Sequence, residues 1–242
     1  METAARGNTK EFERSAAVWF GLMAYVVAVK VVITYAVPAL FRDPSQAAVF
    51  SWPALGIWTV AGLAGVWLSL QTGFPGALSE QVTARQRYLL PILVGLGLAV
   101  LYVAFDLLSG YSRFMIALHG QPSYNIDFPA NVLIYSAGAI IVEVIYRLLP
   151  IPLVLWLVSR VILRGRGEVP IFWVLAVLTS AIEPLTQDLG DAAMGPVIML
   201  TAMALDYSLN FSQAVFFRKF GFLASILTRV AFYMIWHVAY VH

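Results

Sequence analysis

The sequence has 242 residues, of which 61% are hydrophobic and 12% are charged, and its formal net charge at pH 7 is +2. Soluble domains have roughly 45–50% apolar and about 25% charged residues, so this composition excludes a soluble domain and indicates an integral membrane protein. The small net charge gives no basis for a nucleic-acid partner. The absence of Cys excludes disulfides, thiolate metal sites and a Cys nucleophile.

Apolar runs recur along almost the whole chain. A run of about 20 residues has the length that crosses roughly 30 Å of hydrocarbon. We expect a single all-α domain over residues 1–242, a bundle of about seven transmembrane helices. The spans are expected at residues 16–40, 47–71, 88–109, 129–163, 169–187, 193–217 and 219–241. The fourth is too long for one straight crossing, so it either tilts and projects into the cytoplasm or breaks near Pro150 and Pro152.

Basic residues predict the orientation, because most of them fall on one side of a seven-span chain. That side has Arg6, Lys10, Arg14, Arg85, Arg87, Arg160, Arg164, Arg166, Arg218 and Lys219. The opposite side has only Arg42 and Arg113. The positive-inside rule therefore places the N-terminus in the cytoplasm and the C-terminus outside. The compact loops and this charge pattern indicate a bacterial cytoplasmic (inner) membrane.

Several ionisable side chains fall inside the expected spans. Each costs on the order of 2.5–3.5 kcal/mol by insertion scales, so such residues tend to face the bundle interior and to pair. The set is Lys30, Asp106, Glu143, Arg147, Glu183, Asp206, Arg229 and His237. Asp206 shares a helix face with Asn210 and Gln213, and this stripe suits either hydrogen bonding between helices or a polar cavity.

Two sets of positions have helical spacing. Glu143 and Arg147 are four residues apart on one helix face, with the acid first, which is the favourable order. They form either a structural ion pair or a catalytic carboxylate oriented by the Arg. Arg229, Tyr233 and His237 are also spaced by four and make a polar stripe about 12 Å long. We expect Arg229 to pair with Glu143 or Glu183, whereas His237, near the outer boundary, is either an interfacial or a functional residue.

The stretch AIIVEVIYRLLP (139–150), followed by GFLASILTRVAFY (221–233), resembles the CPBP family of intramembrane proteases, which includes the type II CAAX prenyl endopeptidases. That family has a Glu-Glu-x-x-x-Arg helix, then a Phe-x-x-x-His helix, then a helix that starts with Gly and ends in His-x-x-x-Asn. The resemblance covers roughly residues 130–235. It divides the domain into three N-terminal spans (15–128) and a four-span CPBP-like core (129–242).

The resemblance assigns family positions to residues of this chain. Glu143 and Arg147 hold the second Glu and the Arg of the first motif, and Val142 replaces the first Glu. In TSAIEPLTQ (179–187), Glu183 and Gln187 stand where the middle motif has Phe and His.

In the last motif, Arg229 stands at the His position and Tyr233 at the Asn position. Peptide hydrolysis needs a base that activates water and donors that stabilise the oxyanion. An Arg stays protonated near neutral pH and cannot be that base. A zinc site made of Glu143, Glu183 and His237 would join residues at mismatched depths. The resemblance therefore implies an inactive catalytic site, and we expect no cofactor or metal.

Four functions remain open. The first is a catalytically inactive CPBP-like protein whose former cavity is closed by a Glu143–Arg229 ion pair and which acts as a scaffold, chaperone or accessory subunit. The second is an active intramembrane protease that uses Glu143 with Glu183 or His237. The third is a small transporter or channel, and the fourth is a subunit that binds pigment, quinone or lipid. The expected partners are membrane lipids and other membrane proteins.

Overall fold

The structure is a computed structural model that describes residues 2–37, 44–119, 125–187 and 194–240. These residues form helices and short connections, and no strand occurs among them. The α-helices are α1 (Glu2–Ala36), α2 (Pro44–Val49), α3 (Trp52–Gln71), α4 (Leu90–Ser109), α5 (Tyr111–His119), α6 (Ala130–Glu143), α7 (Pro150–Leu155), α8 (Glu168–Gln187), α9 (Pro196–Phe220) and α10 (Phe222–Tyr233). Wider π-helical segments extend or join several of them: η2 (Arg85–Leu89), η3 (Val144–Leu148), η4 (Trp156–Ile162) and η6 (Met234–Ala239).

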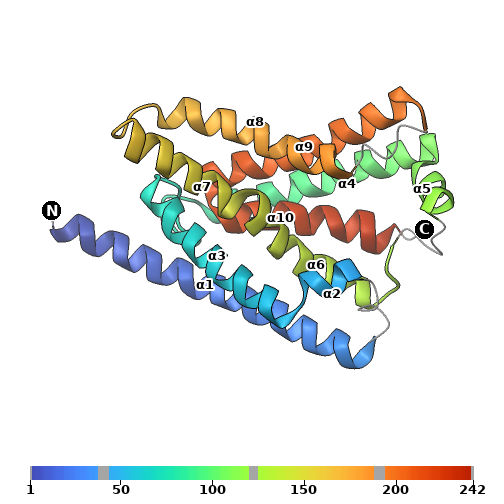
Figure 1. Ribbon diagram of the computed structural model, residues 1–242, viewed down its shortest axis with the longest axis horizontal. Helices are drawn as coiled ribbons and strands as arrows, with labels where there is room; N and C mark the ends of the chain where they lie inside the picture. The colour runs from blue at the N-terminus through green and yellow to red at the C-terminus, as the bar shows by residue number, and fades with distance from the viewer. Residues whose placement is uncertain (1, 38–43, 120–124, 188–193, 241–242) are drawn as a thin grey trace.

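The long helices lie side by side and alternate in direction (Figure 1). Within the described residues, six helices are long and apolar enough to cross a membrane: Thr9–Ala36, Trp52–Gln71, Arg85–Ser109, Ala130–Ile162, Glu168–Thr186 and Phe222–Ala239. The predicted all-α membrane bundle is thus confirmed. The sixth expected span corresponds to α9, which is 25 residues long. Its mean hydropathy is lower because it contains the polar stripe of Asp206, Asn210 and Gln213.

The fourth expected span is one continuous helical element, Ala130–Ile162, of 33 residues. The α-helical pattern widens at η3, just before Pro150. Proline has no N–H and cannot donate to the carbonyl one turn earlier. The widened turn instead brings the Leu149 N–H to the Val144 carbonyl at 3.4 Å. As a result the helix continues past the proline, and η3 carries the Arg147 side chain into the bundle.

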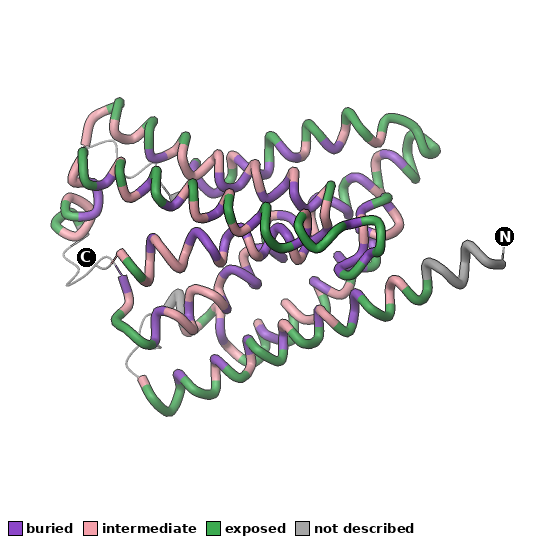
Figure 2. The backbone as a smooth tube through the Cα atoms, turned by 180° about the vertical axis from the view of Figure 1, so that it is seen from behind, coloured by how far each residue is buried: buried purple, intermediate pink, exposed green. Residues whose placement is uncertain are grey.

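Helix α10 lies near the centre of the bundle and packs against α4, α6 and α9. The approach to α4 is close at Gly95, where an added Cβ would lie 2.2 Å from the Thr228 carbonyl oxygen. Helices α1 and α3 cover the other side of α6, η3 and α7. Buried positions concentrate along these inner faces, and exposed positions lie on the outside of the bundle (Figure 2). This arrangement encloses the polar side chains of α6, η3, α8, α9 and α10.

The connection between α3 and η2, here called loop 72–84, packs against the start of the bundle. Two side chains of α1 hold its backbone. Glu11 Oε1 accepts a hydrogen bond from the Gly76 N–H at 3.0 Å, and Ser15 Oγ accepts one from the Ala77 N–H at 3.0 Å. Since Ala77 is fully buried, this loop is an integral part of the fold.

Candidate polar site in the bundle

The first ion pair of the site joins two residues on one helical element. Glu143 ends α6 and Arg147 lies in η3, and both side chains are fully buried. Arg147 Nε donates to Glu143 Oε2 at 2.8 Å. Ser225 Oγ of α10 donates to the same carboxylate oxygen at 2.7 Å. The i,i+4 spacing seen in the sequence therefore produces a local ion pair, and that pair also contacts α10.

The second ion pair joins α10 to α8. Arg229 donates from Nη1 to Glu183 Oε1 at 2.8 Å and from Nη2 to Glu183 Oε2 at 2.5 Å. Such a two-pronged contact is the strongest arrangement of an Arg and a carboxylate. Arg229 also donates from Nε to Gln213 Oε1 at 3.1 Å and from Nη1 to the Tyr233 hydroxyl at 2.9 Å. This guanidinium, only 1% exposed, is thus surrounded by acceptors.

The hypothesis that Glu143 and Arg229 form an ion pair is wrong, because each of them pairs with another residue. Glu183 of α8 lies opposite Arg229, and Arg147 and Ser225 occupy Oε2 of Glu143. Of the two partners that the sequence left open for Arg229, the structure contains Glu183. The physical reason is that Glu143 already has a cation one turn away on its own helix.

Asn210 of α9 joins the two ion pairs. Its Oδ1 accepts from Arg147 Nη1 at 2.8 Å and from Arg229 Nη2 at 2.8 Å. Its Nδ2 donates to the Asp206 carbonyl at 3.0 Å. We call the connected set the central network; it consists of Glu143, Arg147, Glu183, Asn210, Gln213, Ser225 and Arg229. The network links α6 and η3 to α8, α9 and α10.

The sequence did not indicate that Ser225 belongs to this network. Ser225 lies four residues before Arg229 and hence on the same face of α10. Gln213 donates from Nε2 to the Ser225 carbonyl at 3.1 Å. The polar stripe on α9 was found, and its Asn210 and Gln213 form hydrogen bonds between helices, which is one of the two alternatives left open for it.

Two atoms of the network have no hydrogen-bond partner among the described residues. They are Oε1 of Glu143 and Nη2 of Arg147, and both are buried. An unpaired buried polar atom costs about 1–3 kcal/mol, so these two atoms are the unsatisfied positions of the network.

The other candidate residues lie around the network. Tyr233 contacts it through Arg229, and Asp206 is half-buried beside Asn210, whose Nδ2 lies 3.5 Å from Asp206 Oδ1. Gln187 is the last residue of α8, and its side chain lies outside the part of the chain that is described.

His237 lies farther along the last helix and belongs to a different cluster. Its Nδ1 is 2.5 Å from Asn125 Oδ1, and its ring stacks on Tyr135 with a centroid distance of 4.0 Å. Tyr135 donates to the same Asn125 oxygen at 3.2 Å. The stripe of Arg229, Tyr233 and His237 is therefore divided between the central network and this outer cluster.

The described residues contain no group of three or more His, Cys, Asp and Glu side chains placed to hold a metal ion. The considered trio of Glu143, Glu183 and His237 is accordingly not brought together. Glu183 has an Arg as its counter-ion, and His237 has an amide as its neighbour.

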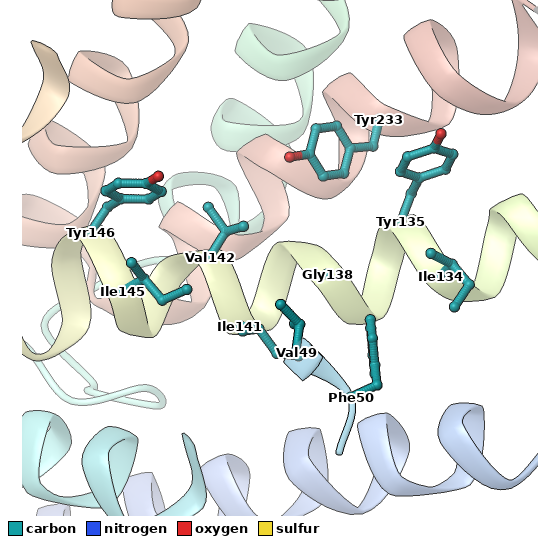
Figure 3. A pocket seen from close by; sticks show the side chains of 10 residues that line it. All are labelled: Val49, Phe50, Ile134, Tyr135, Gly138, Ile141, Val142, Ile145, Tyr146 and Tyr233. Atoms are coloured by element: carbon teal, nitrogen blue, oxygen red, sulfur yellow. The ribbon is translucent and has the colours of Figure 1, made fainter. Parts of the chain in front are cut away.

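A cavity of about 350 Å³ lies beside the central network. One wall is the face of α6 and η3 that contains Gly138 and Val142, and the opposite side is formed by Val49 and Phe50 at α2 (Figure 3). Tyr233, which accepts a hydrogen bond from Arg229, closes its inner end. Tyr233 thus contacts both the central network and this largely apolar cavity.

Comparison of the chain with known protein families, with curated proteins and with solved structures found no match. The fold and the site geometry establish an integral membrane protein with a helical bundle and a buried polar network.

Proposed function

We propose that this chain is a catalytically inactive membrane protein resembling the CPBP proteases, which serves as a scaffold or accessory subunit of a membrane complex. The observation that carries the proposal is the central network. In it, every ionised group of the two pairs has an opposite charge within 2.8 Å, and the pairs join four helical segments. Such a network stabilises one arrangement of the helices.

The arrangement is unsuited to water activation at the family positions. Arg229 replaces the expected His and remains protonated, so it cannot accept a proton. Both carboxylate oxygens of Glu183 are engaged by Arg229. A base must have a free lone pair within hydrogen-bond reach of the water it deprotonates, and Glu183 has its oxygens directed at a cation instead.

The charge distribution supports a cytoplasmic N-terminus. Helix α1 begins, and α3, η4 and α9 end, at the same end of the bundle (Figure 1). Basic residues lie at this end, and Arg85 at the start of η2, Arg166 after η4 and Lys219 in the last turn of α9 are exposed. We place this end in the cytoplasm of a bacterial cell and the protein in its cytoplasmic membrane.

A peptidase assay tests the first half of the proposal. Purified protein in mild detergent is incubated with a farnesylated peptide and with a transmembrane peptide, and products are followed by mass spectrometry. We expect no product above a protein-free blank, for the wild type and for Glu143→Gln alike. Cleavage by the wild type that Glu143→Gln abolishes would overturn the assignment as an inactive protein.

Native mass spectrometry tests the second half. After gentle extraction from the native membrane, a scaffold should be released as a complex of fixed stoichiometry with another membrane protein. Isolation as a monomer with bound lipid alone, at protein concentrations close to those in the membrane, would contradict the scaffold role.

A second candidate, a hydrolase that depends on Glu143, is favoured by one observation. Oε1 of Glu143 is buried and has no partner among the described residues, and Nη2 of Arg147 beside it is in the same condition. A carboxylate oxygen in that state can accept a proton from a water molecule held there. The Glu143→Gln comparison in the peptidase assay decides between the two candidates.

A further inference from the structure

The cavity beside α6 lies at membrane depth. Its wall of α6 and η3 residues, from Ile134 to Tyr146, is in the first half of the Ala130–Ile162 span. The medium outside this part of the bundle is the hydrocarbon of the bilayer. A molecule that enters the cavity therefore comes from the lipid phase.

The size of the cavity favours a thin occupant. A helix with its side chains is about 10–12 Å wide. The cavity holds about 350 Å³. A single hydrocarbon chain is much thinner than a helix and fits into this space.

Glycine at position 138 keeps the cavity open. A Cβ added to Gly138 would meet no atom within 4 Å, so the space directly above this backbone is unfilled. Helix interiors disfavour Gly by about 1 kcal/mol relative to Ala. Gly138 therefore lowers the stability of the helix, and it leaves the cavity wall without a side chain at this position (Figure 3).

One end of the cavity is polar. The hydroxyls of Tyr146 and Tyr233 point toward each other above Val142 (Figure 3). The Tyr233 oxygen accepts a hydrogen bond from Arg229 Nη1 at 2.9 Å, which leaves its own O–H directed elsewhere as a donor. A cation behind a phenol strengthens that donor. This end of the cavity is therefore suited to an oxygen that accepts a hydrogen bond.

The surrounding charges select an uncharged head group. Arg229 and Glu183 neutralise each other, and Asp206 lies close enough to Tyr146 and Tyr233 to interact electrostatically with both. A carboxylate or phosphate at the tyrosines would be repelled by Asp206. A carbonyl or hydroxyl oxygen would be free of that repulsion.

We propose that this cavity binds a single-chain amphiphile from the bilayer, with its chain over Gly138 and an uncharged, hydrogen-bonding head at Tyr146 and Tyr233. The binding site goes beyond the scaffold role and does not depend on it. A peptidase activity of the protein would leave the site unaffected, and an empty site would leave the inactive-scaffold proposal unaffected.

Photocrosslinking with a diazirine-bearing C16 fatty alcohol in nanodiscs tests the site. The variant Gly138→Leu fills the cavity, and the matched control Gly97→Leu adds the same side chain to α4, at an exposed glycine that also has nothing within 4 Å. Both substitutions favour the helix, so loss of folding does not confound the result. We expect labelled peptides from α2 and α6, with yields about tenfold lower in Gly138→Leu and unchanged in Gly97→Leu.

Two further measurements address the head group. Unlabelled hexadecanol should compete with the probe better than palmitate does at a pH where palmitate is ionised. Tyr146→Phe should weaken capture of the alcohol probe while leaving capture of a diazirine alkane without a head group unchanged. Equal labelling of Gly138→Leu and wild type, labels spread evenly over the outer surface, or stronger competition by palmitate would each overturn the proposal.

Discussion

The central network and loop 72–84 both join distant helices through polar contacts. They differ in whether the partners of the polar side chains are other side chains or backbone groups. In the network, the Arg147 and Arg229 guanidinium groups bind other side chains, and the Arg229 and Glu183 side chains are 1% and 6% exposed. At the loop, Glu11 and Ser15 bind backbone N–H groups, and Arg218 Nη1 donates to the Thr72 carbonyl at 2.7 Å.

The arginines of the two regions also differ in their surroundings. Arg218 pairs with Glu168 at 2.8 Å and stacks over Phe74 with its Cζ 4.7 Å from the ring centroid, yet both charged side chains are 23% exposed. Water can therefore form hydrogen bonds with the groups that a substitution of Arg218 leaves without a partner. Water does not reach the surroundings of Arg229, where the loss of a partner leaves a buried charge unpaired. The loss of stability on removing an arginine should therefore increase with the burial of that arginine.

The largest effect is expected for Arg229→Ala. It leaves the Glu183 carboxylate without its cation inside the bundle, which typically costs about 3–5 kcal/mol. We expect a large loss of thermal stability in detergent, measured by fluorescence-detected size exclusion after heating. The control is Arg166→Ala, at an exposed position. Equal melting of Arg229→Ala and wild type would show that the network has no structural role.

A double substitution sharpens this result. Replacing both partners with apolar residues, Arg229→Met and Glu183→Met together, removes the stranded charge, and such exchanges are often close to neutral for stability. We expect the double variant to recover most of the loss that Arg229→Ala produces. Failure to recover would mean that the hydrogen bonds of Arg229 to Asn210 and Gln213 matter more than the ion pair.

The next largest effect is expected for Asn210→Ala. The change removes the oxygen that accepts from both Arg147 and Arg229, and a hydrogen bond to a charged group contributes about 1.5–3 kcal/mol. We expect a loss of stability smaller than that of Arg229→Ala, in the same assay. The matched control is Ser208→Ala on the same helix, because the Ser208 hydroxyl only donates within its own turn, to Ala204 at 2.6 Å.

The bundle could be predicted from the sequence because long apolar runs have few alternative structures in a membrane. The pair of Glu143 and Arg147 also followed from spacing alone, since residues four apart on a helix are neighbours. The ion-pair partners that lie on different helices could not be predicted from spacing. Whether Arg229 meets Glu143 or Glu183 depends on the rotation and depth of α8 and α10, and spans assigned to within several residues do not determine these.

The packing of loop 72–84 and the presence of the cavity were even harder to predict from the sequence. Loop 72–84 reads as a short polar connection, and nothing local indicates that α1 supplies acceptors for its backbone. The cavity depends on the distance between α2 and α6, which lie far apart in the chain. The division into residues 15–128 and 129–242 comes from the CPBP resemblance and stays a prediction, as does that resemblance itself.

A smaller effect is expected for Arg218→Ala, the corresponding change at the loop. It removes the contacts with Thr72, Glu168 and Phe74, but partial exposure lets water solvate the groups left behind. We expect faster proteolytic cleavage within loop 72–84 with only a modest change in melting temperature. The neighbouring exposed Lys219→Ala is the control. A loss of stability as large as that of Arg229→Ala would break the proposed link between burial and effect.

The smallest effect is expected for Arg14→Ala, which removes an ion pair with Glu80 near the same loop. The two groups are 3.5 Å apart, but their side chains are 61% and 90% exposed. Exposed pairs of this kind contribute about 0–1 kcal/mol. Wild-type and variant proteins should therefore melt together and be cleaved in the loop at the same rate. If Arg14→Ala instead loosened the loop as much as Arg218→Ala, the net charge at this end of the bundle would hold the loop, and added salt should then reproduce the effect in the wild type, because screening weakens exposed charges far more than buried ones.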